Sequence, residues 1–131
     1  TGVYDMSGGS EEYVAAFLNN GNNALTNNGS SLVNGDAKTR NVYSKGDTDN
    51  QSNNYSANSE KYGDAVYETS TSGSGSKSWY GDSSYFSNTS GPFFRRGGSY
   101  SNGVTAGVFR FYSANGGSNS YYSFRPVLVA L

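Results

Sequence analysis

The stretch that decides the fold is Phe93–Leu131, which reads FFRRGGSYSNGVTAGVFRFYSANGGSNSYYSFRPVLVAL. Within it, Ala106–Tyr112 alternates and is rich in aromatic and β-branched side chains, and Ser123–Val129 is again apolar, so both segments predict strands. Between them, Ser113–Ser120 consists almost wholly of Ser, Asn, Gly and Ala, a composition typical of a loop. We therefore expect two strands to hold the ends of a loop that faces solvent together with its aromatic rim.

The composition of the 131 residues predicts a single domain with an aromatic core. Only 34% of the residues are hydrophobic, but twelve are Tyr and seven are Phe, and each ring can bury roughly 150–250 Å². Nine basic residues against ten acidic ones leave no basic surface for nucleic acid, and no apolar run is long enough for membrane insertion. Without Cys or His, the chain has no nucleophilic Cys, no His base and no Cys/His zinc site.

The first two thirds of the chain predict little regular structure. Ser10 followed by two glutamates is typical of a helix N-terminus, while the apolar residues Tyr13–Leu18 fit either a helix or a buried strand. The polar segments Asn19–Asn34 and Lys45–Asn58 are predicted to be loops. The other expected features are a short element within Glu60–Thr69 and aromatic anchors at Val42–Tyr43, Tyr85–Phe86 and Phe93–Phe94. Because Thr1–Tyr4 has the character of the middle of a fold, we expect the chain to be the C-terminal part of a longer protein.

Acidic residues provide weaker candidates. Asp47 and Asp49 lie in a segment with oxygen-bearing side chains at alternate positions, as a calcium loop requires. Glycine is missing at the sixth position of that loop, and Asn58 rather than Glu stands at the twelfth. Calcium is thus a candidate ligand, with a solvated polar loop as the alternative. Nothing in the spacing brings together a second set of carboxylates, which we expect to be surface charges: Asp64, Glu68 and Asp82.

Tyrosines set among Ser, Asn and Gly are the most informative feature of the last third. Four of them fall in one segment: Tyr100, Tyr112, Tyr121 and Tyr122. Tyrosine gives a large, stiff, amphipathic contact at low entropic cost, and Ser, Gly and Asn give adaptable hydrogen bonds, as in antibody loops. The composition therefore indicates a binding surface, with the solvated face of an aromatic β-protein as the alternative.

Two blocks of the sequence resemble one known family. Gly2–Gly9, GVYDMSGG, followed by Glu12-Tyr13-Val14, is similar to the signature G-L-Y-D-M-x-G-N-V-W-E-W of the formylglycine-generating-enzyme, or sulfatase-modifying-factor, superfamily. Arg96–Gly103, RGGSYSNG, with Phe124-Arg125-Pro126-Val127, is similar to the R-G-G-S-W-x-N … G-F-R close of that family. The two blocks lie at the two ends of the chain, in the family's order.

The resemblance implies an α+β, β-rich domain with a C-type-lectin-like fold. In that fold a small twisted antiparallel sheet carries long irregular loops, the chain ends lie close together, and the Glu12–Tyr13 stretch is a strand, which overrules the local helix signal. Departures from the family concern the enzyme: its cysteines are absent here, Glu11 stands where the family has Trp, and Gly9 where it has Asn. The resemblance therefore implies the non-enzymatic branch, which needs no cofactor.

That branch comprises ligand-binding variable proteins of phage tails and bacterial surfaces, some of them diversified by retroelements. It implies a receptor-binding or adhesin domain that is extracellular, on a virion or a bacterial surface, and recognises a cell-surface protein or glycan. Related proteins form homo-oligomers, trimers among them, or belong to larger particles. The mixture of Tyr, Ser, Asp and Gly that adenine-directed mutagenesis produces from Asn codons matches this segment, so we expect diversification here too.

Within this interpretation the residues divide into a framework and a contact surface. The expected framework is Gly97, Gly98, Phe124 and Arg125, with Phe109, Phe111, Val127 and Val129 facing the core. The expected ligand contacts are Tyr100, Ser101, Asn102, Thr105, Arg110, Tyr112, Asn115, Asn119, Tyr121 and Tyr122. Two other functions stay open. One is a structural subunit of a filament or virion whose aromatics pack against neighbouring copies, and the other is a degenerate enzyme or calcium-dependent lectin.

Overall fold

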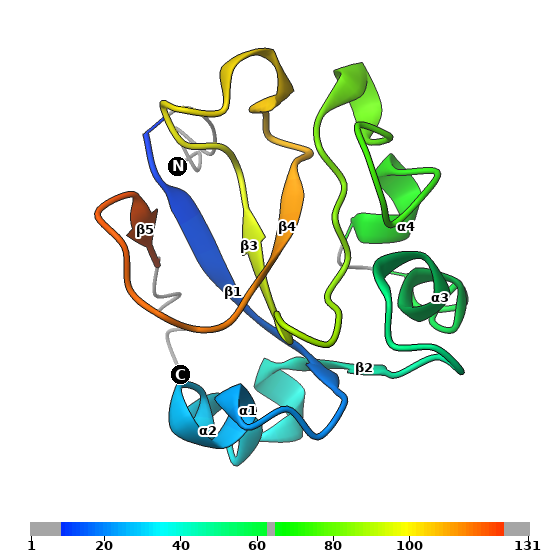
Figure 1. Ribbon diagram of the computed structural model, residues 1–131, viewed down its shortest axis with the longest axis vertical. Coiled ribbons are helices and arrows are strands. Elements are labelled where there is room, and N and C mark those ends of the chain that lie inside the picture. Colours follow the sequence, from blue (N-terminus) through cyan, green and yellow to red (C-terminus); the bar gives the residue numbers. More distant parts are fainter. Residues whose placement is uncertain (1–8, 63–64, 125–131) are drawn as a thin grey trace.

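The computed structural model describes residues 9–62 and 65–124, which form a five-stranded mixed sheet with short helices around it (Figure 1). The strands follow the order β2-β1-β3-β4, and β5 also pairs with β1. Their bounds are β1 Glu11–Asn19, β2 Asn41–Ser44, β3 Phe93–Arg96, β4 Phe111–Ala114 and β5 Tyr122–Ser123. The expected α+β class is confirmed at this level.

The sheet is mixed rather than antiparallel, which corrects the expectation. β3 is antiparallel to β1 and to β4, but β2 and β5 both run parallel to β1. Parallel neighbours need a crossover, and residues 20–40 supply one between β1 and β2. The last described strand reaches the start of the first, because Glu11 pairs with Tyr122 and Glu12 with Ser123. The two ends of the described chain thus meet in one sheet.

Tyr13–Leu18 lies in β1, so the strand prediction is correct and the local helix signal of Ser10 is overruled. The backbone N–H of Leu18 donates to the carbonyl of Pro92 at 2.7 Å, and the strand has β3 on one side and both β2 and β5 on the other. Long-range pairing on both edges, together with burial of Phe17 and Leu18 on opposite faces, outweighs a few tenths of a kcal/mol of helix preference.

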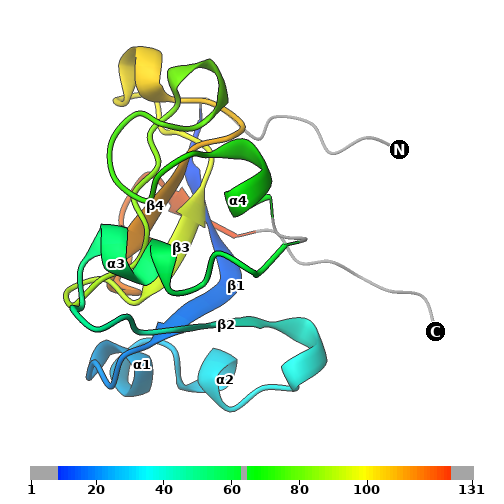
Figure 2. The same cartoon turned by 90° about the vertical axis from the view of Figure 1, so that its right-hand side faces the viewer.

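Short helices replace part of the predicted loops, which corrects Asn19–Asn34 and Lys45–Asn58. The first contains α1 Ala24–Asn27 and α2 Ser30–Val33, and the second contains α3 Gln51–Ser56. An asparagine side chain caps α3, since Oδ1 of Asn50 accepts from the N–H of Asn53 at 2.9 Å. A further helix, α4 Val66–Thr69, and three 3-10 turns at 37–39, 79–81 and 103–105 complete the described helices. Figure 2 shows α1 and α2 at one end of the sheet, away from α4.

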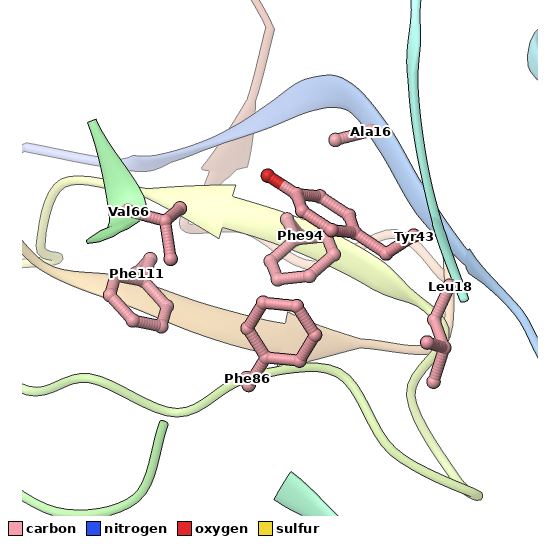
Figure 3. Packing of buried hydrophobic residues seen from close by; sticks show 7 residues of the cluster. All are labelled: Ala16, Leu18, Tyr43, Val66, Phe86, Phe94 and Phe111. Atoms are coloured by element: carbon pink, nitrogen blue, oxygen red, sulfur yellow. The ribbon is translucent and has the colours of Figure 1, made fainter. Parts of the chain in front are cut away.

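The larger core cluster covers one face of the sheet with aromatic rings (Figure 3). Phe86 packs on Phe94 at 4.9 Å between ring centroids and on Tyr43 at 5.1 Å. The cluster is completed by Ala16, Leu18, Val66 and Phe111. The anchors expected at Val42–Tyr43, Tyr85–Phe86 and Phe93–Phe94 therefore each contribute a buried ring, and aromatic side chains supply most of the core volume.

A second, smaller cluster lies on the opposite face and under α1. It consists of Phe17, Leu25, Phe93 and Ala114. Gly29 and Gly116 let two loops close over the ring of Phe93, since a Cβ at Gly29 would lie 2.3 Å from its Cζ. The rest of this face, toward the start of β1, is polar, and it carries the site described below.

Buried asparagines fasten the polar loops that the aromatic core does not reach. Asn54 is fully buried, and its Nδ2 donates to Asp49 at 2.7 Å and to the carbonyl of Ser87 at 3.0 Å. Its Oδ1 accepts from the N–H of Gly46 at 2.8 Å. Satisfied buried amides of this kind stabilise by about 1 kcal/mol per hydrogen bond, which lets an Asn-rich chain with a small core hold a defined shape. Across residues 9–62 and 65–124, no helix has both the length and the apolar character needed to cross a membrane.

Candidate binding site

The centre of the site is a buried carboxylate between two arginines. Glu11 begins β1, where its N–H donates to the carbonyl of Tyr121 at 2.9 Å, and its side chain is only 2% exposed. Nη1 of Arg95, on β3, donates to Oε2 of Glu11, and Nη1 of Arg110 donates to Oε1. Since these residues come from positions 11, 95 and 110, the triad ties the start of the described chain to its last third.

Backbone carbonyls hold both arginines further. Nη2 of Arg95 donates to the carbonyl of Ser113 at 3.2 Å, and Nη1 of Arg110 donates to the carbonyl of Gly97 at 3.1 Å. Gly97 has φ of 72° and thus adopts a conformation that favours glycine. The Nε atoms of both arginines are buried without a hydrogen-bond partner in the described part of the chain. Two cations therefore share one carboxylate and keep unused donors.

Tyrosine rings lie against the two guanidinium groups. The Cζ atom of Arg95 is 4.1 Å from the ring centroid of Tyr122, and that of Arg110 is 4.8 Å from the centroid of Tyr112. Tyr85 packs beside Tyr112 at 4.8 Å, and Tyr121 packs edge-on against Tyr122 at the same distance. A planar cation is attracted to the face of an aromatic ring by the ring quadrupole. The rings and the arginines therefore fix one another's position.

These groups line a cavity of about 460 Å³. Its lining combines the ionic triad, aromatic rings and small polar side chains: Glu11, Ser76, Ser83, Tyr85, Arg95, Ser101, Asn102, Thr105, Arg110, Tyr112, Tyr121 and Tyr122. A volume in the range of roughly 300–1,000 Å³ is typical of small-molecule sites. The cavity is hence large enough to hold a ring-sized polar group.

Most of the predicted contact residues come together in this cavity, and three do not. Its lining contains Ser101, Asn102, Thr105, Arg110, Tyr112, Tyr121 and Tyr122. Tyr100 is 76% exposed and lies outside the lining. Asn119 lines a neighbouring hollow that shares Tyr122, and the exposed Asn115 uses its carbonyl to accept from Nδ2 of Asn28 at 2.8 Å.

Two predicted roles need correction. Arg110 was expected on the exposed contact surface, but it is 4% exposed because it pairs with Glu11. Phe124 was expected in the framework, but it is 75% exposed. Among the other expected framework and core residues, Gly97, Gly98 and Phe111 are buried and Phe109 is half-buried. Arg125, Val127 and Val129 lie outside the described residues.

An exposed aromatic cluster, whose residues are close in sequence to residues of the cavity lining, was not predicted from the sequence. Phe109 packs edge-on against Trp79 at 5.1 Å and stacks on Tyr80 at 5.9 Å. Tyr80 is 91% exposed with φ of 60°, a conformation that non-glycine residues rarely adopt outside functional or tightly constrained sites. The signal available in the sequence was a single Trp followed by Tyr-Gly inside a polar loop.

The acidic candidates are structural or exposed. Asp49 accepts from Nδ2 of Asn20 at 3.1 Å and from Nδ2 of Asn54 at 2.7 Å, while Asp47 is exposed. No three acidic, His or Cys side chains gather as metal ligands would within the two described ranges. Asp82 is buried, contrary to the expected surface charge, because Oδ2 accepts from the N–H of Phe109 at 3.1 Å. Glu68 is exposed on α4, and Asp64 lies outside the described residues.

Burial raises the pKa of Tyr13 and Tyr122, which both line the hollow next to the cavity. The pKa of Tyr13 lies above its usual value mainly because burial disfavours the phenolate, although the nearby Arg95 opposes this. The pKa of Tyr122 is also raised mainly by burial, which disfavours its phenolate. The hydroxyl of Tyr13 donates to the carbonyl of Gly117 at 2.8 Å and so secures the loop between β4 and β5.

Comparison with known proteins adds no relative: no family model matches the chain, and neither a curated protein nor a solved structure matches it. Function is therefore argued from the site itself.

Proposed function

We propose that this domain is a non-enzymatic receptor-binding or adhesin domain whose contact surface is centred on the tyrosine-lined cavity. The observation that carries the proposal is the pairing of a fixed ionic floor, Glu11 with Arg95 and Arg110, and a rim of tyrosines and small polar side chains. Binding surfaces gain affinity when their large side chains are held before the ligand arrives. Here ring stacking and the buried triad provide that preorganisation.

The proposed setting is the tip of a phage tail or a filament on a bacterial surface, with a C-type-lectin-like fold of the sulfatase-modifying-factor type. In support, parts of the two sequence blocks behind that resemblance are neighbours in space. Glu12 pairs with Arg96 across β1 and β3, and Glu11 and Glu12 pair with the end of the described chain through β5. Diversification by a retroelement belongs to the same proposal, and a locus with neither a reverse transcriptase gene nor a template repeat would contradict it.

The contact surface is tested by binding of the labelled domain to a panel of intact bacterial and animal cells. Tyr112→Ala and Tyr121→Ala should each weaken binding by about 30-fold, corresponding to about 2 kcal/mol, because each removes an aromatic anchor at the centre. Tyr62→Ala is the matched control, since Tyr62 is 73% exposed and does not line the cavity. Unchanged binding of both cavity variants, with thermal unfolding showing them folded, would place the contact surface elsewhere.

A second candidate function is a structural subunit whose aromatics pack against neighbouring copies in a filament or virion. It is favoured by the exposed apolar side chains of Trp79, Tyr80 and Val104, which are 55%, 91% and 96% exposed. Sedimentation over a range of concentrations separates the two functions. Fibres or open-ended assemblies that disappear in Tyr80→Ser would support the subunit, whereas a monomer or a closed trimer would support the binding domain.

A further inference from the structure

We propose that the cavity binds the carboxylate of an acidic saccharide, with the sugar ring against the tyrosines and the small polar side chains. This inference rests on the proposed binding function and names the chemistry that the site would recognise. It starts from the charge balance of the lining, in which Arg95 and Arg110 face the single carboxylate of Glu11.

The two arginines have more hydrogen-bond donors than the described residues use. Each guanidinium offers a planar fork of N–H groups, and the described contacts of Arg110 all run through Nη1. Both side chains are more than nine-tenths buried and line the cavity, and their Nε atoms have no partner in the described part of the chain. Buried donors without partners are costly, so a second anion would be favoured here.

No other carboxylate in the lining competes for that position. Asp82 is the nearest acidic residue in sequence to the lining residue Ser83, but its Oδ2 accepts from the N–H of Phe109, and it does not line the cavity. A carboxylate or sulfate presented by a ligand would form charge-assisted hydrogen bonds, which are roughly twice as strong as neutral ones. The net positive floor thus favours an anion over a neutral group of the same shape.

The walls favour a sugar over an acidic peptide as the carrier of the anion. Hydroxyls of Ser76 and Ser83 and the Nδ2 of Asn102 line or adjoin the cavity and make no hydrogen bond within the residues that the structure describes. A saccharide offers many hydroxyls to such groups and an apolar ring face to Tyr121 or Tyr112. An acidic side chain of a peptide would satisfy the arginines but leave these groups unpaired.

The test is a panel of saccharide pairs with and without carboxylates: galacturonic acid and galactose trisaccharides, glucuronic acid and glucose disaccharides, and sialylated and unsialylated lactosamine. Titration calorimetry of the intact domain should show at least one acidic member binding about tenfold or more tightly than its neutral partner. That preference should shrink as salt is raised from 50 to about 500 mM, because screening weakens the charge contribution.

Three variants separate recognition from folding. Arg110→Gln should abolish the preference for the acidic member, and Arg110→Lys should restore it in part because the charge remains. Glu11→Gln should bind the acidic saccharide more tightly than the unaltered domain while melting at a lower temperature, because it removes the competing carboxylate and weakens the triad. A purely structural Glu11 would instead lower affinity and melting temperature together, and that result would overturn the inference.

The panel also distinguishes the inference from the proposed function. Equal affinity for acidic and neutral members overturns the role of the anion, and binding of hexaglutamate without any saccharide overturns the choice of sugar. If no saccharide binds while the domain still binds cells through Tyr112 and Tyr121, the inference fails and the binding function stands. If cell binding is insensitive to those tyrosines as well, both fail.

Discussion

Phe94 and Phe111 point to one side of the sheet, and their chain neighbours Arg95 and Tyr112 point to the other. The first side is the dry aromatic cluster of Figure 3, in which both phenylalanines are at most 2% exposed. The second side is the cavity, where rings lie against arginines and hydroxyls. The same alternation holds at Tyr85, which lines the cavity, and Phe86, which is fully buried. Phenylalanines, together with Tyr43, thus fill the interior, and tyrosines line the site.

This comparison shows how a chain with 34% hydrophobic residues can both fold and bind. The core side buries ring area, and it has one polar exception, since the hydroxyl of Tyr43 is buried with no hydrogen-bond partner among the described residues. The cavity side needs rings that stay half-buried and can bond to a ligand. Stability and recognition should therefore respond to different residues on the same strands.

The largest expected effect is on the core side. Phe94→Ala should lower the free energy of unfolding by about 3–5 kcal/mol, because it leaves a cavity among Tyr43, Phe86 and Phe111. Tyr112→Ala should lower it much less while removing most cell binding. Chemical denaturation of both variants checks the contrast, and a core variant no less stable than Tyr112→Ala would break it.

A smaller effect is expected from exchanging the two ring types. Phe111→Tyr places a hydroxyl at a position with 0% exposure and should lower the free energy of unfolding by about 1–3 kcal/mol. Tyr112→Phe should change it by less than about 0.5 kcal/mol, since that side chain lies at the cavity. Urea unfolding of the pair measures the difference. Equal costs would mean that the two sides are not distinct.

Alkaline pH should destabilise the fold through Tyr13 and Tyr122. Because the folded-state pKa values of Tyr13 and Tyr122 are raised, their contribution to stability is complete below the unfolded value of about 10 and is lost as pH rises through the folded values. Tyr13→Phe should cost about 1 kcal/mol at neutral pH, through the hydrogen bond to Gly117, and should reduce the alkaline loss. Thermal unfolding between pH 8 and about 11.5 checks this, and an undiminished loss in Tyr13→Phe would assign the titration elsewhere.

The smallest effect is expected at Tyr100. This ring is 76% exposed and outside the cavity lining, so Tyr100→Ala should change stability by less than about 0.5 kcal/mol. It should also weaken cell binding far less than Tyr112→Ala. A loss as large as that of Tyr112→Ala, measured in the same assay, would extend the contact surface beyond the cavity.

The sequence predicted the elements that depend on ring positions and missed those that depend on capping and pairing. The anchors Tyr43, Phe86 and Phe94 were expected from the residues, and strand β1 and the meeting of the two ends of the described chain were expected from the family resemblance. The strand expected at Ala106–Tyr112 was wrong in its bounds, since β4 begins only at Phe111. The helices α1, α2 and α3 were not, because each is only four to six residues long and lies within a segment of loop composition, and α3 depends on the single cap of Asn50. The parallel pairing of β2 and β5 was missed because strand direction depends on distant crossovers.

The candidate site shows the same division. The tyrosines and small polar residues of the last third were evident from composition. The remaining lining residues could not be predicted, because only the folded chain brings them to the cavity: Glu11, Ser76, Ser83, Tyr85 and Arg95. Arg110 was expected to be exposed, and its burial could not be predicted because its partner Glu11 lies 99 positions earlier in the chain. Ion pairs over such separations leave no local trace in a sequence. Trp79 and Tyr80 are both exposed, and their position in a polar segment did not indicate this cluster.

The single-residue alternation along β4 also limits how this protein can change in length. One residue inserted directly after Phe111 would turn every later side chain of the strand over, so that Tyr112 would point toward the interior and not toward the ligand. Two inserted residues would return each later side chain to its original side of the sheet, but they would shift the register of β4 against β3 by two residues. Loop 115–120 carries no ladder pairing, so additions and deletions there leave the facing intact. Among related domains, insertions and deletions should therefore accumulate in the loops between strands, and the strands themselves should change by substitution alone.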